Sequence, residues 1–114
     1  MIAGQKAKQP MHIRLKGAGL FAFAGLWTWG ADEIPTCAII TTAPNELVAT
    51  IHDRMPVILT EGSERLWLDP ETPPVEALTV LRSYPAELME AFPVSTAVNQ
   101  AGRDAPEMVM PVSA

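Results

Sequence analysis

His52 is the residue of this 114-residue chain whose type and neighbours best fit proton-transfer chemistry. Asp53 and Arg54 follow it directly, and it falls at the predicted end of a short helix, where the helix dipole favours a protonated imidazole. Histidine exchanges protons near neutral pH, although a histidine at a helix end can also serve only as a cap. The residue pattern therefore offers one acid–base candidate with an arginine beside it.

The other reactive or aromatic side chains have simpler structural interpretations. His12 lies in a predicted strand with no acid or cysteine next to it, so packing is enough to explain it. Cys37 lies within an apolar predicted strand, where a buried cysteine acts as an inert small hydrophobe. Trp27, Trp29 and Trp67 can stack on nucleic-acid bases. Trp27 and Trp29 fall on one face of a predicted strand, and we expect that face to pack in the core.

Motifs for other chemistries are absent from the sequence. There is no Gly-x-Ser-x-Gly, no glycine-rich phosphate loop and no His-Glu-x-x-His. One cysteine excludes an internal disulfide framework and any metal site built from several cysteines. We therefore expect no metal and no cofactor. No apolar run reaches the roughly 18 residues that span a bilayer, so we expect no membrane association and a reducing, cytoplasmic location.

The formal net charge of −5 is unevenly distributed. Residues 31–114 carry all 13 acids and four of the eight bases. The N-terminal 30 residues carry no acid and the other four bases, which are Lys6, Lys8, Arg14 and Lys16. An acidic total argues against coating of nucleic acid over the whole surface, but it is compatible with a local basic groove. The basic cluster can equally be a solvated strand edge, because lysine there discourages aggregation.

The segments that precede His52 predict strands and one short helix. Met11–Leu15 alternates in apolar character, and Lys16–Gly19 supplies a turn before the long apolar strand Leu20–Trp29, so residues 11–29 are expected to form a hairpin. Thr36–Thr42 is β-branched and apolar enough for a central strand. Thr42 is then expected to cap the short helix that leads to His52.

The segments that follow His52 predict a strand, two helices and two late strands. Arg54–Leu59 is expected to be a strand, and Thr60 can cap a helix that runs to about Leu68. Thr72 and the two prolines after it open another helix, which runs to about Arg82. Late strands are expected over 92–99 and 107–112. One small domain of α+β class follows, mostly antiparallel with short helices, because 11 prolines forbid long ones.

Six segments of the sequence resemble the SOS response-associated peptidase (SRAP) family, also called the abasic-site-processing family. They occur in the family's order and cover about Lys8 to Val112. The most specific is the Ile-His-Asp-Arg-Met-Pro run that contains His52. The segments are Lys8-Gln-Pro10, Phe21-Ala-Phe-Ala-Gly-Leu-Trp27, Ile39-Ile-Thr-Thr-Ala-Pro-Asn-Glu-Leu47, Ile51-His-Asp-Arg-Met-Pro-Val-Ile-Leu59, Trp67-Leu-Asp-Pro70 and Pro93-Val-Ser-Thr-Ala-Val-Asn99.

The resemblance implies a protein of the DNA damage (SOS) response that acts on abasic sites in single-stranded DNA. In this family an N-terminal cysteine closes a thiazolidine ring on the abasic-site aldehyde, which leaves a covalent DNA–protein crosslink. The family is also classed as a cysteine peptidase that removes its own N-terminal segment, and as an abasic-site lyase. The implied fold is a barrel-like, mostly antiparallel sheet, of which residues 1–114 resemble the C-terminal portion of one domain.

Two residues of this chain match site positions of the family. By motif match His52 is the family's catalytic histidine, and its implied role is proton transfer to and from the sugar. Arg54 matches a position that faces the DNA backbone, which implies a phosphate contact. The family's terminal cysteine, an asparagine and the glutamate of a Gly-Phe-Tyr-Glu-Trp motif have no match here. Cys37 is internal and lacks the free α-amine, so we expect the chain to be inactive in crosslinking alone.

Three hypotheses follow. The first is a C-terminal fragment of an abasic-site-processing protein, inactive in crosslinking alone. Such a fragment can fold alone, form a homo-oligomer that covers its exposed edges, or pair with the N-terminal half. The second is a degenerate copy that holds single-stranded DNA non-covalently through the Arg54 surface. The third is a hydrolase that uses His52 with a further group. Thr28 and the Met11-His12 pair depart from the family pattern, which affects local packing only.

Overall fold

The structure of the protein is a computed structural model that describes residues 8–113. Lys6 of the basic cluster lies outside the described residues. The chain divides into two compact units. One contains residues 15–89, and the other contains residues 8–14 together with 90–113 among the described part.

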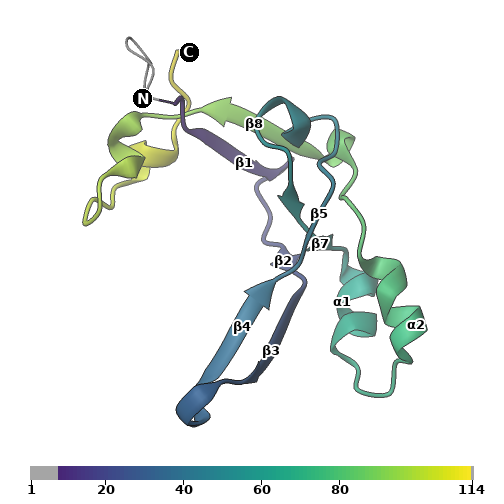
Figure 1. The fold of residues 1–114 in the computed structure, drawn as a ribbon. Helices are drawn as coiled ribbons and strands as arrows, with labels where there is room; N and C mark the ends of the chain where they lie inside the picture. Colours follow the sequence, from purple (N-terminus) through teal and green to yellow (C-terminus); the bar gives the residue numbers. More distant parts are fainter. Residues whose placement is uncertain (1–7, 114) are drawn as a thin grey trace. The chain divides into compact units, whose positions relative to one another are not determined.

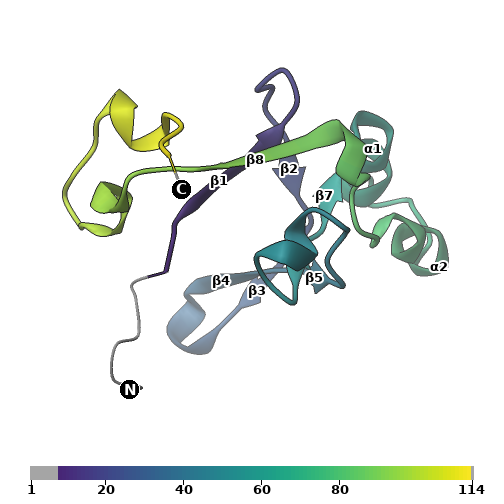
Figure 2. The same cartoon turned by 90° about the horizontal axis from the view of Figure 1, so that it is seen from above.

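In the smaller unit, the first and last strands of the chain pair with each other. β1 (Met11–Leu15) neighbours β8 (Met89–Pro93), and Figure 2 shows the two running side by side. Two single-turn 3₁₀ helices follow β8, η5 (Thr96–Asn99) and η6 (Pro106–Val109). The unit therefore joins distant segments of the sequence. For example, Gln9 Nε2 donates to Val94 O at 2.8 Å, across 85 positions of the sequence.

In this unit the side chains of Arg14 and His12 both contact the ring of Phe92 in β8. The Arg14 guanidinium lies 5.0 Å from the centre of its ring and forms an ion pair with Glu90. The His12 ring centre lies 5.1 Å from that of Phe92, and His12 Nδ1 is 3.3 Å from Val109 O. Packing and a backbone contact thus account for the placement of His12.

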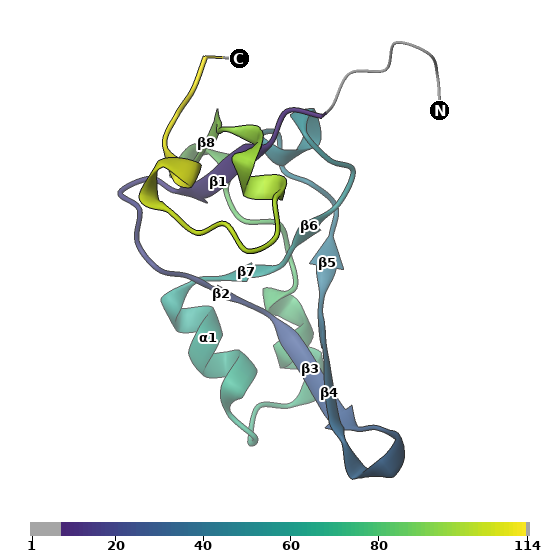
Figure 3. The same ribbon diagram turned by 90° about the vertical axis from the view of Figure 1, so that its left-hand side faces the viewer.

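The larger unit contains three antiparallel strand pairs, which are β2–β7, β3–β4 and β5–β6 (Figure 1). Their bounds are β2 (Ala22–Phe23), β3 (Gly25–Trp29), β4 (Pro35–Ile39), β5 (Thr41–Thr42), β6 (Met55–Pro56) and β7 (Ile58–Leu59). The β3–β4 pair forms a ribbon that ends in the 3₁₀ turn η1 (Ala31–Glu33), as Figures 1 and 3 show.

Three backbone hydrogen bonds join the strand pairs in a closed ring. Ala24 N–H donates to Val57 O, Val57 N–H donates to Ile40 O, and Ile40 N–H donates to Ala24 O, each at 2.9 Å. We call these three residues the backbone triad. Each lies between two strands, so each chain segment pairs with one neighbour before its triad residue and with another after it. Ala24 and Val57 are fully buried, which makes the triad the centre of the core.

Short helices cover this centre. Thr60 begins α1 (Glu61–Leu68), because its side chain accepts the Ser63 N–H at 3.2 Å. α2 (Pro74–Ala77) continues into η3 (Leu78–Val80), and Figures 1 and 2 show α1 and α2 side by side. η2 (Val48–Thr50) and η4 (Ala86–Leu88) complete the unit. Ala24, Val57, Leu59 and Val80 form the buried cluster, with Ile40, Leu66, Trp67 and Leu81 packed against it.

The predicted class and several elements are confirmed. The fold is α+β with mostly antiparallel pairing, although the strands of residues 8–113 form four two-stranded sheets and no closed barrel. The strand at 11–15 and the helix that ends at Leu68 have their predicted bounds. Gly17, with φ of +88°, supplies the predicted turn. No helix within the described part of the chain has the length and apolar character needed to cross a membrane.

The predicted pairing of strands was wrong in two respects. Residues 11–29 do not form a hairpin, because β1 pairs with β8 instead. The strands expected over 20–29, 36–42 and 54–59 are each interrupted, at Ala24, Ile40 and Val57, where the chain changes partner at the triad. Long-range pairing of this kind leaves no signal in local alternation of polar and apolar residues.

Two elements near the C-terminus were also predicted wrongly. The strand expected over 92–99 ends at Pro93, and the Ser95 hydroxyl accepts the Ala97 N–H at 3.1 Å to start η5. The strand expected over 107–112 is the helical turn η6, which begins with a proline at its first position. Ser and Pro are favoured at the start of helical turns, and here this local preference prevailed.

The core prediction for the ribbon was wrong as well. Trp27 is 64% exposed and Trp29 is 63% exposed. Cys37, directly opposite Trp27 in β4, is exposed too rather than buried. All five residues of β4 are exposed, so this strand is not central in its sheet.

Candidate functional site

The loop that carries His52 is built on Asn45. The Asn45 side-chain oxygen accepts the Val48 N–H at 2.9 Å and so begins the helical turn η2. Its Nδ2 donates to Tyr84 O at 2.6 Å, and its backbone N–H points at the Met55 sulfur at 3.3 Å. Asn45 rather than Thr42 is therefore the cap of this turn, which corrects the prediction.

The end of η2 brings His52 to the surface. The N–H groups of Ile51 and His52 both donate to Val48 O at 2.8 Å, so the turn closes at His52. The His52 side chain is 68% exposed. The expected position of His52 at the end of a helical segment is thus confirmed, although the segment is a single 3₁₀ turn.

Strand register decides the direction of Arg54. Thr41 lies opposite Pro56 and Thr42 lies opposite Met55. Side chains alternate between faces along a strand, and Met55 is 2% exposed. Arg54 directly precedes Met55, so its side chain lies on the opposite, outer face. Thr41, which pairs with Pro56, lies on that same face and is the diagonal neighbour of Arg54.

Thr41 holds the Arg54 side chain at three points. Arg54 Nη2 donates to Thr41 O at 2.8 Å and to Thr41 Oγ1 at 2.9 Å, and Arg54 Nε lies 3.3 Å from the same hydroxyl. These contacts leave Nη1 without a hydrogen bond to any residue in the range 8–113. Within that same range no carboxylate forms an ion pair with Arg54. The site therefore presents an anchored and uncompensated positive charge.

The His52 ring is held through Nδ1. The Arg54 backbone N–H, which can only donate, points at Nδ1 over 3.1 Å. In the tautomer of the neutral ring that carries its proton on Nε2, Nδ1 accepts this bond. Nδ1 also lies 3.1 Å from Asp53 Oδ1 and 3.2 Å from Arg54 O, which can accept from the ring once Nδ1 is protonated. Both protonation states thus have partners within the loop.

The structure brings the two predicted site residues together and separates them from the cysteine's strand pair. His52 and Arg54 share one loop, whereas Cys37 belongs to the β3–β4 ribbon, opposite Trp27. Within residues 8–113 no group of three His, Cys, Asp or Glu side chains is arranged to hold a metal ion. The sequence analysis missed Thr41 and Asn45. Knowledge of the β5–β6 register would have identified Thr41, because it sets the diagonal contact with Arg54.

Comparison with known proteins identifies relatives along most of the chain. The family model described as SOS response associated peptidase (SRAP) matches residues 3–101. The abasic site processing protein YoqW of Bacillus subtilis is 50% identical over 109 residues, and the abasic site processing protein HMCES of Gallus gallus is 40% identical over 105.

The relatives are longer than this chain. The match to YoqW covers 91% of this chain and 49% of YoqW, and the match to HMCES covers 85% and 30%. A crystal structure of a protein from Bacteroides thetaiotaomicron superposes with a TM-score of 0.81 at 28% identity, over 99% of this chain and 51% of that one. The chain thus spans about half the length of YoqW. On the family match and the identity to several abasic site processing proteins, the chain belongs to the SOS response associated peptidase (SRAP) family.

Proposed function

We propose that this chain is the C-terminal portion of a single SRAP domain and that it binds single-stranded DNA containing abasic sites. The proposal is supported by the names of its relatives, which are abasic site processing proteins. The observation that carries it is the exposed pair of His52 and Arg54. In this pair a cation that has no acidic partner among the described residues lies beside a proton-transfer group.

In this proposal Arg54 contacts a DNA phosphate. Its anchor to Thr41 uses Nε and Nη2, and Nη1 has no hydrogen-bond partner within residues 8–113. A guanidinium that is already held loses less side-chain entropy when it binds an anion. Phosphate contacts fix the position of a protein on the DNA without reading its sequence, which suits the recognition of damage in any sequence context.

His52 is proposed to transfer protons at the deoxyribose of the abasic site. The protonated ring gives its Nε2 proton to the sugar, while Asp53 Oδ1, 3.1 Å from Nδ1, accepts from the Nδ1–H that the ring keeps. The neutral ring that is left has a lone pair on Nε2, which can take the proton back. Both steps use a ring that its own loop orients, as general acid–base catalysis requires.

The covalent step of the family needs a group that Cys37 does not provide. A thiazolidine closes on the amine and the thiol of one residue, and the nitrogen of an internal cysteine is an amide. We therefore propose that the 114-residue chain by itself retains DNA non-covalently.

The test is an electrophoretic mobility assay with a single-stranded oligonucleotide that carries one abasic site. The chain is compared with Arg54→Ala and with Arg82→Ala as the matched control. Arg82 is an exposed arginine of the same unit and donates to Thr79 O from Nε and Nη2 at 3.1 and 2.9 Å. Loss of one phosphate contact should weaken binding and lower the slope of log K against log salt by about 0.7.

The control variant should bind like the unmodified chain. Equal losses for Arg54→Ala and Arg82→Ala would indicate only general electrostatic attraction and would contradict the proposed site. Retarded complexes should also dissociate in denaturant. A denaturant-stable adduct formed by the chain alone would overturn the non-covalent proposal.

A further inference from the structure

The β3–β4 ribbon has two faces of different character. Register places Trp27 opposite Cys37 and Trp29 opposite Pro35, and it places Gly25 opposite Ile39, so these residues share one face. Leu26, Thr28, Thr36 and Ala38 occupy the other face. We call the first the tryptophan face.

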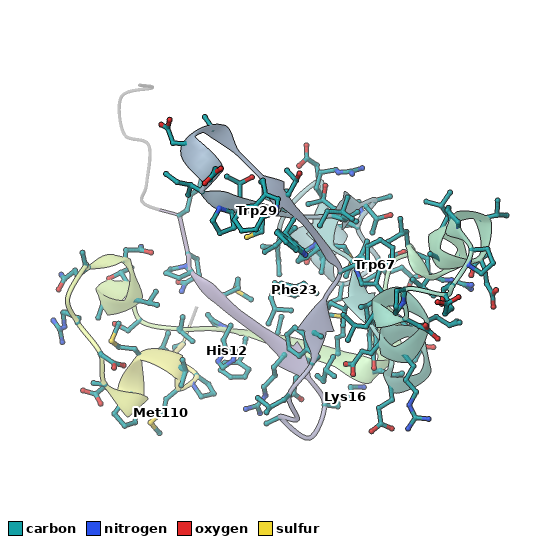
Figure 4. The ribbon with its side chains drawn as sticks, turned by 90° about the horizontal axis from the view of Figure 1, so that it is seen from below. His12, Lys16, Phe23, Trp29, Trp67 and Met110 are labelled. Carbon is teal, nitrogen blue, oxygen red and sulfur yellow. The ribbon has the colours of Figure 1, made fainter. Side chains whose placement is uncertain are left out.

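The tryptophan face is apolar and uncovered. Trp27 is 64%, Trp29 63% and Ile39 55% exposed. The two indole rings contact each other edge to face, with their centres 5.6 Å apart, and Figure 4 shows Trp29 on the ribbon, away from Trp67 on α1. A two-stranded ribbon is marginally stable in water without a covering layer, and exposed aromatic clusters mark interaction surfaces.

The ribbon also lacks the devices that protect free strand edges. β3 and β4 pair only with each other among the described strands. Proteins usually place lysine or other charges along such edges, but no lysine or arginine occurs between positions 17 and 53 of the sequence. The charged residues at the ribbon tip are the acids Asp32 and Glu33.

The charge pattern distinguishes between classes of partner. A nucleic acid needs cations beside any aromatic groups on which its bases stack, and the ribbon offers acids instead. A polypeptide needs only apolar contact area and free backbone groups, both of which the ribbon presents.

The lengths of the relatives indicate which polypeptide covers the tryptophan face. The crystal structure from Bacteroides thetaiotaomicron matches 99% of this chain with only 51% of its own residues, and YoqW matches with 49%. In these relatives an equally long stretch belongs to the same protein as the matched half. We propose that the tryptophan face of the ribbon is the docking surface for that other half of a SRAP domain, with Trp27 and Trp29 as its anchors.

The test adds the other half from a relative. The 114-residue chain is co-expressed with the part of YoqW that lies outside its match to this chain, and complex formation is measured by size-exclusion chromatography with light scattering. A 1:1 complex is expected. Trp27→Ser combined with Trp29→Ser should weaken it roughly tenfold or more, because buried tryptophans dominate interface energetics. Thr28→Lys, on the opposite face of the same strand, is the matched control and should leave the complex intact.

Cys37 gives a second readout that does not depend on whether a variant folds well. It is exposed and is the only cysteine of this chain, so alkylation can be followed on its own peptide by mass spectrometry. The complex should slow the alkylation of Cys37 at least tenfold. Absence of a complex, unchanged alkylation, or equal loss of binding in Thr28→Lys would overturn the proposal. A homodimer that buries Cys37, or DNA that protects it, would assign the face to a different occupant and would overturn it too.

Discussion

The ring nitrogen Nδ1 of His52 accepts a hydrogen bond from the backbone N–H of Arg54 at 3.1 Å. The imidazole thus closes a turn over its own next two residues, in the way that an asparagine side chain closes an Asx turn. This bond requires the tautomer of the neutral ring that carries its proton on Nε2. Arg54 in turn is fixed by Thr41, so the ring, the loop and the guanidinium form one connected unit.

The first prediction concerns this turn. His52→Ala removes the acceptor of the Arg54 amide, and because a hydrogen bond contributes about 1 kcal/mol, the protection factor of that amide should fall about fivefold. His52→Asn should retain most of the protection, since a side-chain oxygen of asparagine accepts an N–H two residues on. Amide hydrogen exchange measured by NMR above neutral pH tests both variants.

An Arg54 amide that is equally protected in the unmodified chain, in His52→Ala and in His52→Asn would show that the ring does not close the turn.

The second prediction concerns Thr41 as the anchor of Arg54. Thr41→Val removes the Oγ1 acceptor but keeps the backbone oxygen that accepts from Nη2 at 2.8 Å. On the proposed DNA function, affinity for an abasic single strand should fall about two- to fivefold, less than for Arg54→Ala, because one anchor of roughly 0.5–1 kcal/mol is lost.

Thr41→Ser is the matched control because it restores the hydroxyl group. It should bind DNA like the unmodified chain in the same mobility assay. If Thr41→Val and Thr41→Ser bind equally well, the hydroxyl does not position the guanidinium, and the backbone oxygen alone is sufficient.

The sequence predicted local features of this site better than its tertiary partners. His52 and Arg54 were found through a contiguous motif, and Thr60 was found through its capping preference, since both signals lie within a few residues. Thr41 and the exposed state of Trp27 could not be found in this way. Each depends on which strand pairs with which, and the exchange of partners at Ala24, Ile40 and Val57 has no local signature. An apolar, β-branched sequence predicts a strand, but the strand is buried only where other elements of the structure pack on it.

The third prediction concerns Asn45, whose side chain holds the turn that leads to His52. Asn45→Ala removes the cap of Val48 and leaves the carbonyl group of Tyr84 without its donor. The free energy of unfolding should fall by about 1–3 kcal/mol, as for other partly buried polar groups that lose their partners. Urea denaturation followed by circular dichroism measures this change.

Asn45→Asp separates the two functions of the side chain. It keeps an oxygen that can accept the Val48 N–H, but it places a second oxygen 2.6 Å from Tyr84 O, where an amide group now donates. This variant should therefore also be destabilised, despite its good capping residue. Stability equal to that of the unmodified chain would show that the Tyr84 contact contributes nothing.

The last prediction concerns the backbone triad that holds the three strand pairs together. Val57 is fully buried, and Val57→Ala deletes two methyl groups from a centre where three chain segments meet. At about 0.8 kcal/mol per buried carbon, with a further contribution from the cavity, the free energy of unfolding should fall by about 2 kcal/mol. Val75→Ala on α2 makes the same chemical change at a side chain that is 80% exposed, and it should change stability by less than about 0.5 kcal/mol. Urea denaturation of the two variants provides the comparison, and similar midpoints would show that the strands do not depend on a packed centre at Val57.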